Sequence, residues 1–474
     1  MIYLEFGDYF GRFDLGTPHD VPGILSLEAG KVPVAHLYLD EVLTKGRDGT
    51  VSLPAAHHFP RVVARLASRH DVLFDRPLVE EQFPKQVFVA APWVLIGVDA
   101  AEAGDQWDSV EIYSPGIDAV LGNAVASTTF PDGTTESRSF SVELTNPVFE
   151  SEQDDVAVVC QYYMSANVFD PYQFGVRNFG QIRLRSISTM NARNWITNWI
   201  DPLLSLLSVA TGQREQATRI IFACGRKDGD KSSPNPIEAQ LFRSSLSQTD
   251  EPAARRFRPS GALVESIFLL SHAPPLATML AEWRSLRGEA AVQLFNIARD
   301  RELPASVRFL LCMQALESLN TSQNAEKETV EDAQYADRRT VALSQLAGVP
   351  SEQVDPTTRK FIKTNVPKKP ARSLADRIKS MIEVCGVAED RQGAWKQSTQ
   401  ELVKILSKLG YPATTLHDRL ASLRNVISHG RVHIAQHRIE PAAQVADALL
   451  RAEFVRCLRF DQSQIEFALA QMNS

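Results

Sequence analysis

The spacing of hydrophobic and polar residues divides the chain into a strand-rich first part and a helix-rich last part. Over residues 1–190, short runs with alternating apolar positions, such as 87–91 and 139–144, are separated by Pro-Gly and Asp-Gly turn sequences. One stretch, 61–68, has apolar residues at helical spacing instead and predicts a short helix. We therefore expect a β-rich N-terminal domain over 1–190.

The middle of the chain, residues 191–300, has a mixed and mostly helical pattern. Apolar residues at helical spacing predict a helix over 194–209, and a strand-like run follows at 219–224. A long polar stretch then contains one short predicted helix at about 236–246. Residues 263–299 have helical spacing again, and we interpret the whole segment as a connecting region.

The sequence pattern of residues 301–474 predicts a helix bundle, with recognisable signals where the helices start and end. Five helices are expected, at about 304–319, 373–385, 398–409, 414–428 and 441–460. Ser373 and Ser398 are the expected caps of the second and third helices. A long insertion, about 321–370, separates the first two helices. The fold class predicted for the chain is α+β multidomain, with a β-rich domain first and a helix bundle last.

Charge is spread unevenly between these parts. The formal net charge of −7 argues against a protein that coats nucleic acid through bulk charge, but residues 300–474 carry +3 and the remainder −10. The most basic stretch, 359–379, contains Lys368 and Lys369. It is either a solvated surface or a patch that contacts phosphate. The acidic opening residues and the lack of a long apolar segment predict a soluble, cytoplasmic protein without a membrane partner.

Neither the cysteines nor the histidines form a metal-binding pattern. The five cysteines lie far apart in sequence and are odd in number, so we expect free thiols. The sequence contains no HExxH, P-loop or GxGxxG motif. Neither a metal nor a cofactor is expected, although ligands far apart in sequence stay possible.

The candidate chemistry lies on the predicted helix 414–428. Its apolar residues form one stripe, and a continuous polar arc lies on the other side. The stripe consists of Leu416, Leu420, Leu423 and Ile427, and the arc of Arg424, Asn425, Ser428 and His429. A histidine there can transfer a proton or contact a phosphate, and the guanidinium can hold phosphate oxygens through paired hydrogen bonds. Gly430 is placed to end the helix.

The spacing of Arg424 and His429 is not distinctive by itself. An arginine followed by a histidine after four to six residues also occurs at Arg12/His19, Arg65/His70 and Arg431/His437. Context separates the first pair from the others, because it alone lies late on an amphipathic helix that ends at a glycine. It also has an asparagine directly after the arginine.

Glu317 is a second candidate site residue. The helix 304–319 is apolar on nearly all sides and should be central in the bundle, which would bury part of Glu317. A buried carboxylate requires a cation or several hydrogen-bond donors, and Arg424 is the candidate partner. The alternative is an exposed glutamate near the helix end.

These segments resemble a known family. The run from Phe309 to Leu319, the Ser373-Leu-Ala-Asp-Arg-Ile segment and the Leu423-Arg-Asn-Val-Ile-Ser-His-Gly segment are similar to the HEPN domain of the Apea type. The opening Gly11-Arg-Phe-Asp-Leu and Pro22-Gly-Ile-Leu segments resemble the N-terminal domain of that family.

The resemblance implies a bacterial phage-defence protein that cuts RNA, tRNA being one possibility, after a phage-derived trigger and so arrests growth. It implies a metal-independent endoribonuclease in which the RNA 2′-hydroxyl attacks the phosphodiester. The family's motif residues transfer to Arg424, Asn425 and His429, and its acid to Glu317. We add Ser428, Arg431, Lys368 and Lys369 as substrate-binding candidates. The resemblance also implies a homodimer or higher oligomer formed through the bundle.

Two other interpretations stay open from the sequence, a non-catalytic HEPN-like module and a helical protein unrelated to this family. Some HEPN-like domains bind nucleotides or partners without cleaving RNA, so a non-catalytic sensor module is the alternative. Motif completeness favours the enzyme, because both Arg424 and His429 are present. We interpret the N-terminal domain as a sensor or regulatory module.

Overall fold

The structure is a computed structural model of the chain, and it describes most of the residues. The described residues are 4–14, 20–38, 63–82, 86–117, 125–129, 141–145, 149–167, 175–225, 236–246, 275–286, 289–300, 302–368, 370, 373–430 and 433–471.

The chain forms two compact units, Met1–Ser285 and Leu286–Met472. The first contains a large antiparallel sheet and the second is helical, which confirms the α+β class. The boundaries expected at 190 and 300 differ from this division. Residues 191–246 belong to the first unit because two of their strands pair into its sheet. Hydrogen bonding to distant strands, which a local pattern does not contain, decides this boundary.

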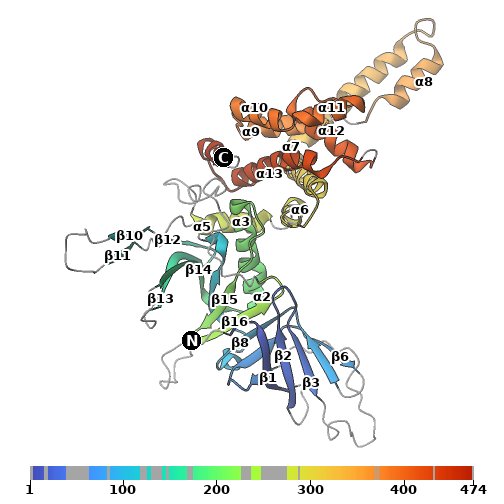
Figure 1. Cartoon of the computed structure of the whole chain (residues 1–474). Coiled ribbons are helices and arrows are strands. Elements are labelled where there is room, and N and C mark those ends of the chain that lie inside the picture. The colour runs from blue at the N-terminus through green and yellow to red at the C-terminus, as the bar shows by residue number, and fades with distance from the viewer. Residues whose placement is uncertain are drawn as a thin grey trace, which may run out of the picture. The chain divides into compact units, whose positions relative to one another are not determined.

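Fourteen of the described strands form one sheet, in which neighbouring strands are antiparallel (Figure 1). Their order is β12-β13-β14-β9-β15-β16-β8-β5-β4-β1-β2-β3-β7-β6. The strands are β1 Gly7–Asp14, β2 Val21–Leu27, β3 Val34–Tyr38, β4 Val63–Leu66, β5 Asp71–Phe74, β6 Leu78–Gln82, β7 Gln86–Ala90, β8 Trp93–Gly97, β9 Trp107–Tyr113, β12 Phe149–Gln153, β13 Val156–Asn167, β14 Gly175–Met190, β15 Arg219–Cys224 and β16 Ile237–Arg243. A separate hairpin joins β10 Val125–Thr129 and β11 Ser141–Thr145.

Two expected helices are strands, so those predictions were wrong. The stretch 61–68 contains β4, which pairs with β1 and β5, and 236–246 contains β16, which pairs with β15 and β8. A short apolar run is compatible with both the helical and the strand spacing of apolar residues. Each of these two runs is a strand because neighbouring strands pair with its backbone hydrogen-bonding groups. The strand expected at 219–224 is confirmed as β15.

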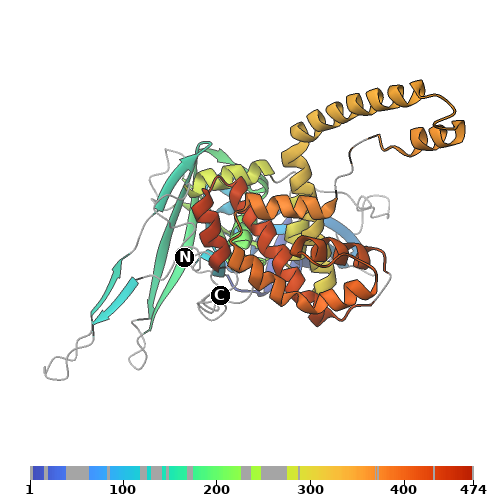
Figure 2. The ribbon, with the colours of Figure 1, turned by 90° about the horizontal axis from the view of Figure 1, so that it is seen from above.

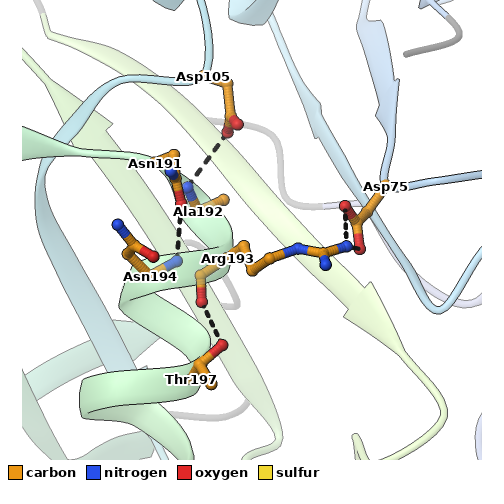
Figure 3. A network of polar contacts seen from close by, with 7 residues as sticks. All are labelled: Asp75, Asp105, Asn191, Ala192, Arg193, Asn194 and Thr197. Atoms are coloured by element: carbon orange, nitrogen blue, oxygen red, sulfur yellow. Dashed lines mark hydrogen bonds and ion pairs between the residues drawn. The ribbon is translucent and has the colours of Figure 1, made fainter. Parts of the chain in front are cut away.

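The helix expected at 194–209 is confirmed and is anchored to the sheet by polar contacts. It begins as α2 Ala192–Trp195, passes through a π-helical turn at Ile196–Ile200 and ends as α3 Asp201–Thr211. Figure 3 shows Arg193 reaching Asp75, the residue after β5; Nη2 donates to the two carboxylate oxygens at 2.6 and 2.5 Å. This charge-assisted contact joins the start of the helix to a strand 118 positions earlier.

The second unit consists of helices packed around one core. They are α6 Ala290–Ala298, α7 Ala305–Gly348, α8 Pro356–Asn365, α9 Leu374–Val384, α10 Glu389–Ser398, α11 Gln400–Lys408, α12 Leu416–Ser428, α13 Gln436–Cys457 and α14 Gln462–Gln471. A further helix, α5 Leu276–Leu286, precedes them. Phe309 and Leu316 of α7, Leu420 of α12 and Phe454 of α13 are fully buried, and α7 packs against both α12 and α13.

The expected insertion at 321–370 is an extension of the first bundle helix. α7 spans 44 residues in total and ends at Gly348 instead of near 319, and α8 returns beside its far end (Figure 2). Arg359 of α8 attaches this helix to the segment that follows α7, because its Nη2 donates to the carbonyl oxygen of Val349 at 2.5 Å and to that of Val354 at 3.2 Å. The residues of α7 from 321 onward are helical although none of them is buried.

The structure confirms some expected helix ends and corrects others. Ser373 caps α9 by accepting the backbone N–H of Asp376 at 3.1 Å. Ser398 was expected as a cap but is the last residue of α10, and its hydroxyl donates to a carbonyl oxygen of its own helix. The last predicted helix begins at Gln436, so Pro441 lies inside α13 instead of starting it.

Candidate functional site

Helix α12 positions the polar motif, and its start is set by a capping box. The Thr415 hydroxyl oxygen accepts the backbone N–H of Asp418 at 3.1 Å and donates to its carboxylate at 2.6 Å. These hydrogen bonds, chiefly that from the Thr415 hydroxyl, lower the pKa of Asp418. Three residues of the expected apolar stripe are buried, and Val426 replaces Ile427 as the fourth.

Buried polar residues then fix the first half of α12. Arg419, which is 6% exposed, donates to the carbonyl oxygens of Ala413 at 2.9 Å and Lys396 at 2.6 Å. The Ser422 hydroxyl donates to the Pro412 carbonyl oxygen at 2.6 Å. These bonds attach α12 to the segments before it, so the polar arc at its C-terminal half is presented by a rigid element.

The predicted pairing of Glu317 with Arg424 is confirmed. Nη2 of Arg424 donates to Oε2 of Glu317 at 3.3 Å, and Nε lies 3.1 Å from Oε1. The pair joins α7 to α12, and the two side chains are 27% and 28% exposed. Both faces of the contact are therefore partly shielded from water. Nη1, which carries two more N–H donors, forms no hydrogen bond with any residue that the structure describes.

The other motif residues lie on the solvent side of the same helix. Asn425 is half-buried, whereas Ser428 and His429 are exposed. The backbone N–H of His429 closes the last turn on the Asn425 carbonyl oxygen at 3.1 Å, and Gly430 follows with φ of 59°. Among the described residues, none forms a hydrogen bond or ion pair with the His429 imidazole.

A neighbouring polar contact was not recognised from the sequence. Arg377 of α9 donates to the Thr321 hydroxyl at 3.0 Å and forms an ion pair with Glu328 at 3.3 Å. Thr321 lies one turn after Glu317 on α7, and its hydroxyl donates to the Glu317 carbonyl oxygen at 2.9 Å. The four-residue spacing between Glu317 and Thr321 was a signal that the two share one helix face.

The expected basic patch is only partly available to an anion. Arg359 and Arg377 are engaged within the unit, and Lys379 lies 3.8 Å from Glu383. Lys368 is exposed. Two other substrate-binding candidates, Lys369 and Arg431, lie outside the described residues, and so does His19 of an alternative pair.

The remaining arginine–histidine pairs lack the helical context of Arg424 and His429. Arg65 and His70 flank the turn between β4 and β5, and the His70 ring is 3.0 Å from the Ser68 hydroxyl. Arg12 lies on β1, and His437 is exposed in the first turn of α13. The described residues of these other arginine–histidine pairs therefore lie on strands, beside a turn or at the start of a helix.

A separate buried charge cluster serves the packing of the bundle. Arg451 of α13 is fully buried, and desolvation lowers its pKa to about 9. Burial likewise lowers the pKa of Arg299, which forms an ion pair with Asp447, to about 10. None of these residues contacts Arg424 or Glu317 in any described hydrogen bond or ion pair.

The five cysteines are free thiols, as expected. Burial raises the pKa of Cys160 to about 12 and that of Cys457 to about 11, so neither is an activated nucleophile. Within the described ranges, no group of three or more His, Cys, Asp or Glu residues could hold a metal ion. None of the helices in the same ranges is long and apolar enough to cross a membrane.

Comparison of the chain with protein-family models, with curated proteins and with solved structures gives no match in any of the three.

Proposed function

We propose that the helical unit is a HEPN-type endoribonuclease whose active site is the polar C-terminal half of α12. One observation supports this most strongly: Glu317 holds the Arg424 guanidinium through Nε and Nη2, and the exposed His429 lies at the end of the same helix. A fixed cation and an exposed imidazole on one helix suit a reaction that moves protons near a phosphate.

The proposed reaction requires no external nucleophile. The RNA 2′-oxygen attacks the adjacent phosphorus, the bond from phosphorus to the 5′-oxygen breaks, and the products carry a 2′,3′-cyclic phosphate and a 5′-hydroxyl. The 2′-hydroxyl loses one proton and the leaving 5′-oxygen gains one. His429 performs a proton transfer, Arg424 stabilises the charge on the phosphoryl oxygens, and Asn425 donates an amide hydrogen bond to the same group.

One histidine per chain leaves the second proton transfer without a dedicated group. A two-fold axis would bring a second Arg424/His429 pair beside the first, so we propose a homodimer or higher even oligomer through the helical unit. Ser428 and Lys368, both exposed, would contact the RNA backbone, and Arg431 and Lys369 remain candidates for the same role. The family resemblance adds a cytoplasmic role in abortive antiphage defence with a phage-derived trigger.

The decisive experiment compares His429→Ala with two matched histidine variants, His70→Ala and His437→Ala. All three histidines are at least partly accessible, so the folded state should survive each change. RNA cleavage and growth arrest on overexpression should fall by about 10²-fold or more only in His429→Ala. Full activity of folded His429→Ala would refute the proposal, and RNA binding without cleavage by the wild type would favour the non-catalytic sensor.

A further inference from the structure

A second site lies in the N-terminal unit, on the solvent face shared by β1, β2, β3 and β4. A cavity of about 530 Å³ opens there, a volume typical of small-ligand sites. Its lining includes Phe10, Arg12, Asp20, Pro22, Tyr38 and Arg65. The proposed nuclease chemistry uses none of these residues.

Two of the lining residues are arginines that lie side by side on neighbouring strands. Arg12 of β1 and Arg65 of β4 are register partners on antiparallel strands, so their Cβ atoms are about 5 Å apart. Like charges placed directly opposite destabilise a sheet. Asp71 compensates Arg65 only at the limit of an ion pair, 3.9 Å, and Arg12 has no ion-pair partner among the described residues. Two adjacent guanidiniums in this arrangement match the oxygens of a phosphate.

Aromatic side chains border the arginines on the same face. Phe10 is 67% exposed and Tyr38 is 45% exposed, although the opposite face of β3 is buried and that of β1 is partly buried. The register continues the row from Phe10 through Ile24 and His36 to Phe88, and the His36 and Phe88 rings are 4.3 Å apart. Exposed rings on a sheet are suited to stacking against a nucleobase.

The rim carboxylate adds a third recognition element. Asp20 is exposed and lines the cavity with the arginines and Tyr38. A carboxylate accepts hydrogen bonds from exocyclic amines or ribose hydroxyls, and it would repel a simple multivalent anion. The combination therefore favours a ligand that joins one phosphate to a ring with donors.

We propose that this face binds a nucleotide, with its phosphate on Arg12 and Arg65 and its base stacked on Phe10 or Tyr38. The nucleotide is either free or part of a single strand, and both sources share this chemistry. The proposal does not rest on the nuclease activity, because the site lies in the other unit.

The test uses the full-length chain and two kinds of probe. Calorimetry measures binding of AMP, CMP, GMP, UMP and inorganic phosphate, and fluorescence anisotropy measures a labelled single-stranded oligodeoxynucleotide of about eight residues. The oligodeoxynucleotide lacks the 2′-hydroxyl, so the proposed nuclease would not consume it. At least one nucleotide probe should bind about tenfold or more tightly than phosphate alone. Tighter binding of the strand identifies a segment of nucleic acid, and equal binding identifies a free nucleotide.

Variants then locate the binding on this face. Arg12→Gln/Arg65→Gln and Phe10→Ser should each raise the Kd about tenfold or more. The matched controls are Arg185→Gln, an exposed arginine of β14, and Phe361→Ser on α8, whose ring is 66% exposed against 67% for Phe10. Unchanged melting temperatures would show that the variants fold.

Three results would overturn the proposal. The first is no binding of any nucleotide probe, and the second is phosphate binding as tightly as the nucleotides. The third is a change of oligomeric mass in Phe10→Ser with nucleotide affinity unaltered, which would assign the aromatic face to a second copy of the chain.

Discussion

Replacing Glu317 by glutamine tests whether its ion pair with Arg424 serves the reaction or only stability. Two unit charges about 4 Å apart attract by roughly 4 kcal/mol near a protein surface. Desolvation and side-chain ordering offset most of this for side chains that remain 27% and 28% exposed, which leaves about 1 kcal/mol. Glu317→Gln should therefore lower the melting temperature of the helical unit by about 2–4 °C. RNA cleavage should fall much further, by about tenfold or more, because the guanidinium loses its orientation.

The unit contains a matched control for this substitution. Arg308 and Glu440 join α7 to α13 through a 2.6 Å ion pair, and their side chains are 30% and 36% exposed. Glu440→Gln should cost about the same stability, about 1 kcal/mol, with cleavage unchanged. Thermal melts and initial cleavage rates on the purified full-length chain measure both quantities.

A double-mutant cycle completes the argument. If Glu317 acts only through Arg424, the variant Glu317→Gln/Arg424→Ala should cleave no more slowly than Arg424→Ala alone. Independent, multiplicative losses would refute the coupling. Equal losses of activity in Glu317→Gln and Glu440→Gln would show that the first change acts only through stability.

Four other outcomes follow from the structure and the proposed chemistry. Cleavage should persist in excess EDTA and leave 2′,3′-cyclic phosphate ends; loss that magnesium reverses would refute the mechanism. Light scattering on an active preparation should give an even multiple of 52.6 kDa, and an active monomer would contradict the composite site. Arg419→Leu removes a buried guanidinium that donates to the carbonyl oxygens of Ala413 and Lys396, so the free energy of unfolding should fall by roughly 2–4 kcal/mol, which chemical denaturation measures. The pKa of Asp418 is lowered in the folded state, so the ionised carboxylate stabilises the fold above the unfolded-state pKa of about 4. This stabilisation is lost as the pH falls through the folded-state pKa. Thr415→Val should therefore cost about 1 kcal/mol at neutral pH and less near pH 2, as melts at the two pH values would show.

The hydrophobic pattern alone determined most of the helical unit near the candidate site. The apolar stripe of α12, the cap at Ser373 and the glycine end at Gly430 depend on interactions within a few residues, and a local sequence contains that information. The pairing of Glu317 with Arg424 was also foreseen, because a carboxylate on a nearly all-apolar helix needs a cation.

Tertiary structure decided the features that depend on distant partners. The runs at 61–68 and 236–246 have local patterns that allow a helix, and they are strands because β1, β5, β8 and β15 supply their hydrogen bonds. The pairing of Arg12 with Arg65 is equally invisible in sequence. It results from strand register, which brings residues 53 positions apart to neighbouring sites on one face. Local spacing fixes which side of an element is apolar, whereas backbone pairing across the sheet fixes which elements meet.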